Sequence, residues 1–213
     1  MARVASAEFQ RTYRELRRWG LLLLTDPRVP SVASLAAGEP VRGSWWAHPK
    51  AHTIWHVLVR LSESRDTIAT KLLSGRVTFV HRRLWTPLDC LGSARESWQL
   101  AGLPRASRSL LDAVTRQGEL RTDQVGRSRG VWTAAPGEAA RELERRLLIY
   151  SEEIHTESGA HAKRLETWER WAKRAGLPRA KMTTEQAKKQ FEDIVLNLNR
   201  QFKAACRLPW QTK

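Results

Sequence analysis

Apolar residues recur every three or four positions near the start of the chain, which is the pattern of an amphipathic helix. Phe9, Tyr13 and Leu16 fall on one face of this pattern, and arginines occupy the other positions. We therefore expect a helix over residues 7–24. It should end before Asp26-Pro27, because a proline disfavours helical geometry in the residue that precedes it.

The next part of the chain mixes helical and strand signals. A short helix is expected over residues 31–37, because Ser31 and Gly38 are typical cap residues. A longer helix should run from Pro49 to about Leu61, because proline is favoured in a first helical turn. Two β-rich runs, residues 67–72 and 76–81, flank Ser74-Gly75 and predict a β-hairpin.

The segment from Leu103 to Trp171 has a distinctive order of expected elements, and a helix over about residues 87–98 precedes it. The expected elements are a helix from Leu103 that stops at Gly118, an extended segment at Glu119-Leu120-Arg121, a short helix capped by Thr122, a third helix from near Pro136, and two strands that reverse around Ser158-Gly159. This is the order of a winged helix-turn-helix, which docks on DNA.

A second interpretation of this segment stays open. Apolar residues from Ala140 to Ile154 are spaced three and four apart, so one helix over residues 138–157 would also satisfy the pattern. The consecutive apolar residues Leu147-Leu148-Ile149-Tyr150 and the turn residues at Ser158-Gly159 favour the two strands instead. We therefore predict the wing.

The predicted fold class is α+β, mostly α. We expect an α-rich N-terminal domain over residues 1–98 with a β-hairpin near 67–83, then a winged-helix-like module over 99–172. A basic C-terminal segment over 173–213 should hold one long helix from Thr184 to about Cys206.

Charge is the main outlier of the composition. The chain carries a formal net charge of +15, and 28 of its 37 basic residues are arginine. Arginine suits phosphate oxygens and guanine edges because its guanidinium is a planar donor fork. A sequence pI near 10.9 therefore favours nucleic acid over an anionic membrane as the partner.

Other bulk features bear on location and chemistry. No apolar run is long enough to cross a membrane, and the first residues lack the pattern of a secretory signal peptide. Cys90 and Cys206 are far apart and in no metal-type spacing, so we expect reduced thiols. We accordingly predict a cytoplasmic, bacterial protein that has no cofactor, no metal and no membrane partner.

The candidate nucleic-acid contacts are basic side chains of the hairpin, the third helix, the wing and the C-terminal helix. They are Lys71, Arg76, Arg82, Arg83, Arg141, Arg145, Lys163, Arg164, Lys188 and Lys189. Arg141 and Arg145 are four residues apart and share a face of the helix that would enter the major groove. Three glutamates on that helix argue against its being a strong base reader.

Two further sets of residues are weaker candidates. Trp45 and Trp46 would offer stacking surfaces for unpaired bases if one of them is exposed. His52 and His56 are four residues apart on a helix and are the weak metal candidates, but the glutamate of a metalloprotease motif is missing. Packing of these histidines beside the tryptophans is the preferred interpretation.

Acid and base groups concentrate at the tip of the predicted wing, in Glu153, His155, Glu157 and His161. In a strand the first three would share one face, because side chains alternate. A two-residue turn at Ser158-Gly159 would place His161 opposite Thr156. Such a cluster can supply a general base, so these residues are the catalytic candidates if the protein is an enzyme.

The leading interpretation is a nucleic-acid-binding protein, with double-stranded DNA favoured over RNA, that uses a winged helix and distributed phosphate contacts in repair or transcription. The alternative is a nucleic-acid-processing enzyme of glycosylase or nuclease type. A protein–protein scaffold is the second alternative. The sequence leaves enzymatic activity and oligomeric state open, and we favour a protein without catalysis.

Overall fold

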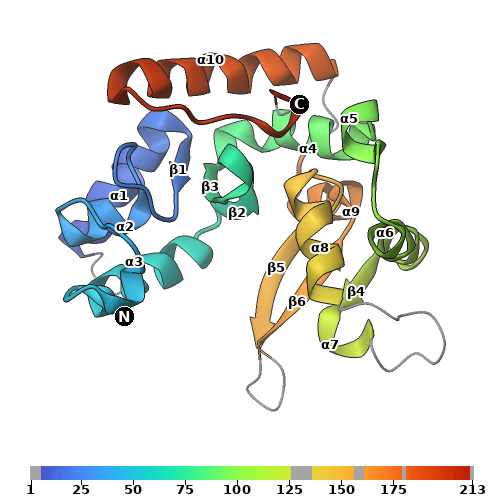
Figure 1. Ribbon diagram of the computed structural model, residues 1–213, viewed down its shortest axis with the longest axis horizontal. Coiled ribbons are helices and arrows are strands. Elements are labelled where there is room, and N and C mark those ends of the chain that lie inside the picture. The colour runs from blue at the N-terminus through green and yellow to red at the C-terminus, as the bar shows by residue number, and fades with distance from the viewer. Residues whose placement is uncertain (1–5, 126–135, 156–160, 179–180, 212–213) are drawn as a thin grey trace. The chain divides into compact units, whose positions relative to one another are not determined.

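The computed structural model describes residues 6–125, 136–155, 161–178 and 181–211 (Figure 1). It is mostly helical, with 58% helix and 15% strand, which confirms the predicted α+β class. The chain divides into two compact units. The first consists of residues 1–85 and 189–212, and the second of residues 86–188. The predicted division into three segments stays a prediction.

The first unit combines helices with one small sheet. Its elements are α1 (Ala7–Trp19), β1 (Leu21–Leu23), α2 (Val32–Ala37), η1 (Trp45–Ala47), α3 (Ala51–Ser62), β2 (Thr67–Lys71), η2 (Leu73–Gly75), β3 (Val77–His81), η3 (Arg82–Leu84), most of α10 (Thr184–Phe202), and η4 (Pro209–Gln211). The predicted hairpin is confirmed as β2 and β3, which pair antiparallel. The short helix is confirmed too, with Ser31 and Gly38 as its caps.

The prediction of one helix over residues 7–24 was wrong at its C-terminal end. Helix α1 stops at Trp19, and Gly20 adopts a left-handed conformation with φ of 80°. The three residues that follow form β1, which pairs with β3 from Leu21↔Val80 to Leu23↔Thr78. All three leucines are buried, so they contribute to the core as an apolar strand at the edge of the sheet β1-β3-β2 rather than as a helix turn.

Helix α3 also starts later than predicted. Pro49 lies before the helix, whose N-cap is Lys50. The buried face of α3 packs with α1 and α2 around Leu16, Val32, Ile54 and Leu61, all of them fully buried. This core holds the polar face of α1 toward solvent.

The second unit contains a second small sheet among helices. Its elements are α4 (Trp85–Ala94, with Trp85 belonging to the first unit), α5 (Ser97–Leu100), α6 (Arg105–Gln117), β4 (Glu119–Arg121), α7 (Thr122–Val125), α8 (Pro136–Arg145), β5 (Tyr150–His155), β6 (His161–Glu166), α9 (Trp168–Arg174) and the first turn of α10. The predicted order of elements from α6 to β6 is therefore present, and the strand order in the sheet is β4-β6-β5.

Residues 147–155 do not continue α8. Leu147 has a positive φ of 52°, and the chain reverses there so that Leu148 and Ile149 enter the core with Leu110, Leu143 and others. β5 then pairs with β6 as the predicted hairpin (Figure 1). The register differs from our expectation, because His161 lies opposite His155 and not opposite Thr156.

Three further expectations about helices needed correction. The helix predicted over residues 87–98 is two helices, α4 and α5, separated at Arg95, which has a positive φ of 50°. The C-terminal helix ends at Phe202 and does not reach Cys206. Helix α9 was missed, although Thr167 caps it and accepts a hydrogen bond from the Arg170 backbone N–H.

Close packing in the second unit depends on one glycine. A Cβ atom on Gly92 of α4 would lie 2.3 Å from Cδ1 of Trp168, so only glycine allows this approach. Trp168 is fully buried and forms edge-on contacts with Tyr150 and Trp171. Helix α9 is thereby fixed to both α4 and the hairpin.

Candidate nucleic-acid interface

Helix α8 carries the arginines that the sequence nominated as base readers. Its inner face is apolar, with Ala140 and Leu143 fully buried. Arg141 and Arg145 are on the outer face, with side chains 50% and 52% exposed. Each has a glutamate partner, at 3.0 Å for Arg141 and Glu138 and at 4.0 Å for Arg145 and Glu142. Exposed pairs of this kind stabilise a protein by less than about 1 kcal/mol, so these arginines can exchange partners.

One face of the hairpin is tied to α8 by a buried carboxylate. Glu144 is only 4% exposed, and its Oε1 accepts hydrogen bonds from Lys163 Nζ at 2.5 Å and from Ser151 Oγ at 2.7 Å. Lys163 was predicted to contact phosphate. Its ammonium group is instead engaged by Glu144, because a buried carboxylate needs a counter-charge.

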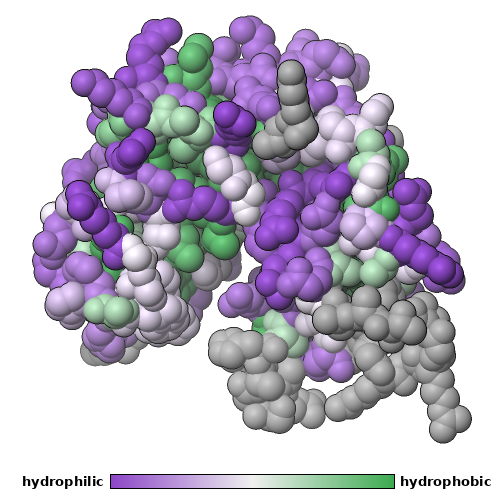
Figure 2. Space-filling model, viewed as in Figure 1, coloured by the Kyte–Doolittle hydropathy of each residue, from purple (hydrophilic) through white to green (hydrophobic). Residues whose placement is uncertain are grey.

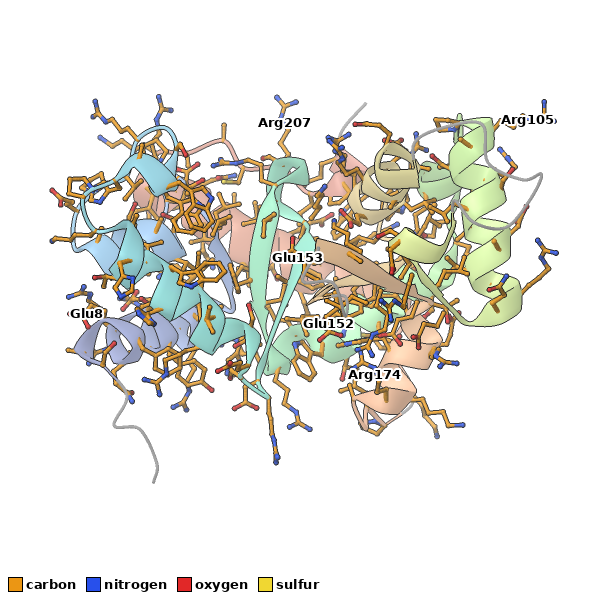
Figure 3. All side chains as sticks on the ribbon, turned by 90° about the horizontal axis from the view of Figure 1, so that it is seen from below. Glu8, Arg105, Glu152, Glu153, Arg174 and Arg207 are labelled. Atoms are coloured by element: carbon orange, nitrogen blue, oxygen red, sulfur yellow. The ribbon has the colours of Figure 1, made fainter. Side chains whose placement is uncertain are left out.

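The other face of the hairpin is tied to α9. Arg164 and Arg174 both donate to Glu152, and Arg174 also donates to the fully buried Glu166 (Figure 3 shows Glu152 and Arg174 close together). Burial raises the pKa of the neighbouring Tyr150 phenol, which stays neutral. The predicted phosphate ligand Arg164 is thus part of an internal charge network.

We call Glu144, Glu152, Lys163, Arg164, Glu166 and Arg174 the hairpin network. Its arginines and lysine have carboxylate partners contributed by the strands and by α8. Breaking a buried pair leaves an uncompensated charge, which is strongly destabilising. These cations are consequently better suited to holding the hairpin than to binding a ligand.

The candidate catalytic cluster is only partly described. Glu157 lies outside the described residues, as do the side chains of His155 and His161. Backbone register places His155 directly opposite His161, and Glu153 two residues before His155 on the same face. The register therefore puts three of the four nominated positions on one face of the hairpin, and Glu153 is exposed there.

In the first unit, α1 presents an arginine-rich face. Gln10, Tyr13, Arg14, Arg17 and Arg18 line an open hollow of about 490 Å³, which we call the α1 hollow. Among the described residues, no carboxylate lies within 4 Å of Arg14 or Arg17. Arg18 has Glu15 at 3.8 Å. The hollow therefore holds cationic charge that the described part of the protein does not neutralise.

The predicted phosphate contacts of the β2–β3 hairpin have internal partners. Arg76 donates to Asp26 Oδ2 at 2.6 Å, and Arg83 donates to the backbone carbonyl of Arg18 at 2.9 Å. Arg82 lies 3.8 Å from Asp66 and over the ring of Trp85. Lys71 also has an interaction partner.

The aromatic and histidine candidates are grouped around η1 and α3. Trp45 is buried, whereas Trp46 stacks on it at 3.8 Å between ring centroids and is 62% exposed. His52 and His56 are exposed, and their Nε2 atoms are 2.8 Å apart. In the described part of the chain, no group of three or more His, Cys, Asp or Glu side chains is arranged to hold a metal ion.

The two lysines nominated on α10 differ in environment. Lys188 Nζ lies 2.7 Å from Glu96 Oε2, and both side chains are mostly buried. Lys189 faces solvent and pairs with Asp193 at 3.4 Å.

Hydrophilic residues cover most of the surface seen in Figure 2. No helix in the described ranges combines the length and the apolar character needed to cross a membrane.

Sequence reasoning missed the glutamates of the hairpin network and the α1 hollow. Acidic residues lower the net positive charge of the sequence, but no local pattern reveals that Glu144 and Glu166 are buried. A signal for the α1 hollow was present, because residues 10, 13, 14, 17 and 18 fall on one helical face. That spacing predicts that Arg14 and Arg17 lie next to each other on the surface of the helix.

Comparison with known proteins gives one match. A family model described as AlkZ related matches residues 7–205, which is nearly the whole chain. No curated protein and no solved structure matches it. The chain therefore belongs to the AlkZ-related family, which indicates a role related to DNA repair and DNA as the partner.

Proposed function

We propose that the protein binds double-stranded DNA through its second unit, with the elements from α6 to β6 acting as a winged helix. The observation that carries this proposal is the order α6-β4-α7-α8-β5-β6 combined with the strand order β4-β6-β5. In helix-turn-helix proteins the second helix of the pair lies in the major groove. Here α8 has that position in the chain.

The charges on α8 support phosphate contact more than base reading. Arg141 and Arg145 are exposed and pair with Glu138 and Glu142 at the surface, and Arg141 Nε also donates to the Gly137 carbonyl at 3.3 Å. Phosphate oxygens can replace the two glutamates as partners. The same glutamates repel phosphate if they stay close to it. Binding should accordingly be dominated by charge, fall steeply with salt and show modest sequence preference.

A salt titration of duplex binding tests this proposal. Fluorescence anisotropy with a 30-base-pair duplex is measured for the wild type and for Arg141→Gln/Arg145→Gln at several salt concentrations. The slope of log K against log salt should decrease by roughly 1–2 in the variant, since each phosphate contact contributes about 0.9.

The matched control is Arg116→Gln/Lys173→Gln, which removes the same charge from exposed positions on α6 and α9. The control should change the slope by less than the α8 variant does. A duplex RNA of equal length tests the preference for DNA. Wild-type binding that is absent or independent of salt would refute the proposal.

One observation favours a second function, nucleic-acid processing of the glycosylase type. The family name refers to AlkZ, which is a DNA crosslink glycosylase. The register of β5 and β6 puts Glu153, His155 and His161 on one face of the hairpin. Carboxylate and imidazole groups can act as the general base that activates water. We propose these residues as the acid–base candidates, with Glu157 as a fourth residue that lies outside the described part.

Turnover on a damaged duplex tests this second function. A duplex with one interstrand crosslink is incubated with the protein, and abasic sites are counted after alkaline cleavage. Glu153→Gln should remove turnover and leave duplex affinity unchanged. Equal turnover by the variant and the wild type would exclude Glu153 as the acid–base group.

A further inference from the structure

The α1 hollow of the first unit is built on two turns of one helix. Its five lining residues are spaced three, one, three and one apart, so their side chains lie on the same face of α1. A helix rises about 1.5 Å per residue, so the Cα atoms of Arg14 and Arg17 are about 4.5 Å apart along the axis. Two planar donor forks converge on one open space.

The charge in the α1 hollow is available to a ligand. Arg14 and Arg17 are exposed, and within the described ranges neither has a carboxylate at ion-pair distance. Arg18 is partly engaged, because it pairs with Glu15 at 3.8 Å and lies over the ring of Trp19. This contrasts with Arg76, whose guanidinium is bound by Asp26.

Asp66, which contacts the lining residue Tyr13, has two partners of its own. Tyr13 donates its hydroxyl proton to Asp66 Oδ2 at 2.9 Å, and Arg82 lies 3.8 Å from Oδ1 of the same residue. Burial and then Asp66 raise the pKa of Tyr13, so the phenol remains a neutral donor. The ion pair of Asp66 is with Arg82, and no ion pair between Asp66 and Arg14 or Arg17 occurs among the described residues.

The end of α1 is held in place from β3 and η3. Arg83 donates to the carbonyl of Arg18 in the last turn, where a positive charge stabilises a helix. Its guanidinium also lies against Gly20, since a Cβ on Gly20 would be 2.9 Å from Arg83 Nη2. The backbone that carries Arg17 and Arg18 is consequently fixed before any ligand arrives.

We propose that the α1 hollow is a phosphate-binding site, and that it takes a phosphate of the DNA backbone. Arginine forks recognise phosphate oxygens in pairs, and a duplex supplies phosphates in series. The choice of DNA as the source of phosphate rests on the proposed function. The first unit would then add a backbone contact that is independent of the arginines on α8.

The test removes the two arginines that have no carboxylate partner. Arg14→Gln/Arg17→Gln in the full chain is compared with Arg28→Gln/Arg42→Gln, which removes equal charge from exposed loop positions of the same unit. The log–log salt slope for the 30-base-pair duplex should decrease by roughly 1–2 in the first variant, by the phosphate contribution of about 0.9 each. Equal slopes for the two double variants would overturn the proposal.

A second measurement separates this site from the proposed function. Inorganic pyrophosphate is added to the wild-type protein, and the Nε–Hε resonances of Arg14 and Arg17 are followed by NMR. Saturable shifts of these resonances, absent for Arg28 and Arg42, support a phosphate site even if duplex binding by α8 fails. Saturable pyrophosphate binding without any change in duplex slope would replace DNA by a free phosphate compound as the ligand, and no shift would refute the site.

Discussion

The hairpin network of the second unit and the α1 hollow of the first unit are both rich in arginine, but their charges have different partners. Arg164 and Arg174 are bound by Glu152, and Arg174 also by the buried Glu166. Arg14 and Arg17 have no such partner among the described residues. The comparison teaches that a basic residue is a good candidate for binding phosphate only where the fold leaves its charge unmatched.

The largest effect is expected from the hairpin network. Glu166→Gln should lower the free energy of unfolding by about 2–3 kcal/mol, because the acceptor of the Arg174 hydrogen bond loses its negative charge and Glu152 becomes the one carboxylate partner of Arg174 among the described residues. Urea denaturation measures this change. The control is Glu153→Gln on the exposed side of the hairpin, where the change should stay below about 0.5 kcal/mol. Equal losses would mean that the network is not structural.

The pairing of Asp26 with Arg76 gives an intermediate effect that depends on pH. Burial raises the pKa of Asp26, but the backbone N–H groups of Val29 and Arg28 and the Arg76 guanidinium outweigh burial, so that the pKa is lowered from 3.8. A folded-state pKa below the unfolded value stabilises the protein above about pH 4. This contribution is lost as the pH falls through the folded pKa.

Asp26→Asn should accordingly cost about 1–2 kcal/mol at pH 7, because charged hydrogen bonds are replaced by neutral ones. The difference from the wild type should be smaller at pH 2.5 than at pH 7, because the pKa of Asp26 is lowered and acid titrates the wild-type carboxyl toward its protonated form only as the pH falls through that pKa. Urea denaturation at both pH values measures it. A difference of equal size at both would contradict this account of Asp26.

The smallest effects are expected from the neighbouring lysines of α10. Lys188→Gln breaks a mostly buried pair with Glu96. Burial raises the pKa of Glu96, but hydrogen bonds from Lys188, Trp98 and Thr184 outweigh burial, so that the pKa is lowered. We expect Lys188→Gln to lower the free energy of unfolding by about 1 kcal/mol. Lys189→Gln breaks an exposed pair and should cost less than about 0.5 kcal/mol. Thermal unfolding compares the two, and the reverse order would argue against burial as the cause.

The sequence predicted elements best where local signals agreed. Ser31 and Gly38 bounded α2, and the β-branched runs on either side of Ser74-Gly75 formed the expected hairpin. It failed at Leu21, Leu22 and Leu23, whose apolar character fits a helix as well as a strand. The outcome was decided by Gly20 and by pairing with β3, and the second of these is a tertiary contact.

The candidate site was harder to predict than the fold. The locations of Lys163 and Arg164 in the hairpin were predicted, but their partners were not. Glu144 lies on α8, and Glu152 is brought opposite Arg164 by strand pairing. Charge can be counted from a sequence, whereas its neutralisation depends on which acids the fold brings near. The spacing of Arg14 and Arg17 predicts a shared helical face, but the fold determines that neither has a carboxylate partner among the described residues.

The central place of β6 in the order β4-β6-β5 has a consequence for synthesis on the ribosome. β5 and β6 are hairpin neighbours and can pair within about 1–10 μs, but β4 is made two helices earlier. Until residues 161–166 emerge, β4 has no strand to join, and Arg170 is not yet there to bind Glu119. In the nascent chain, β4 should therefore remain unpaired until almost all of the second unit has been translated.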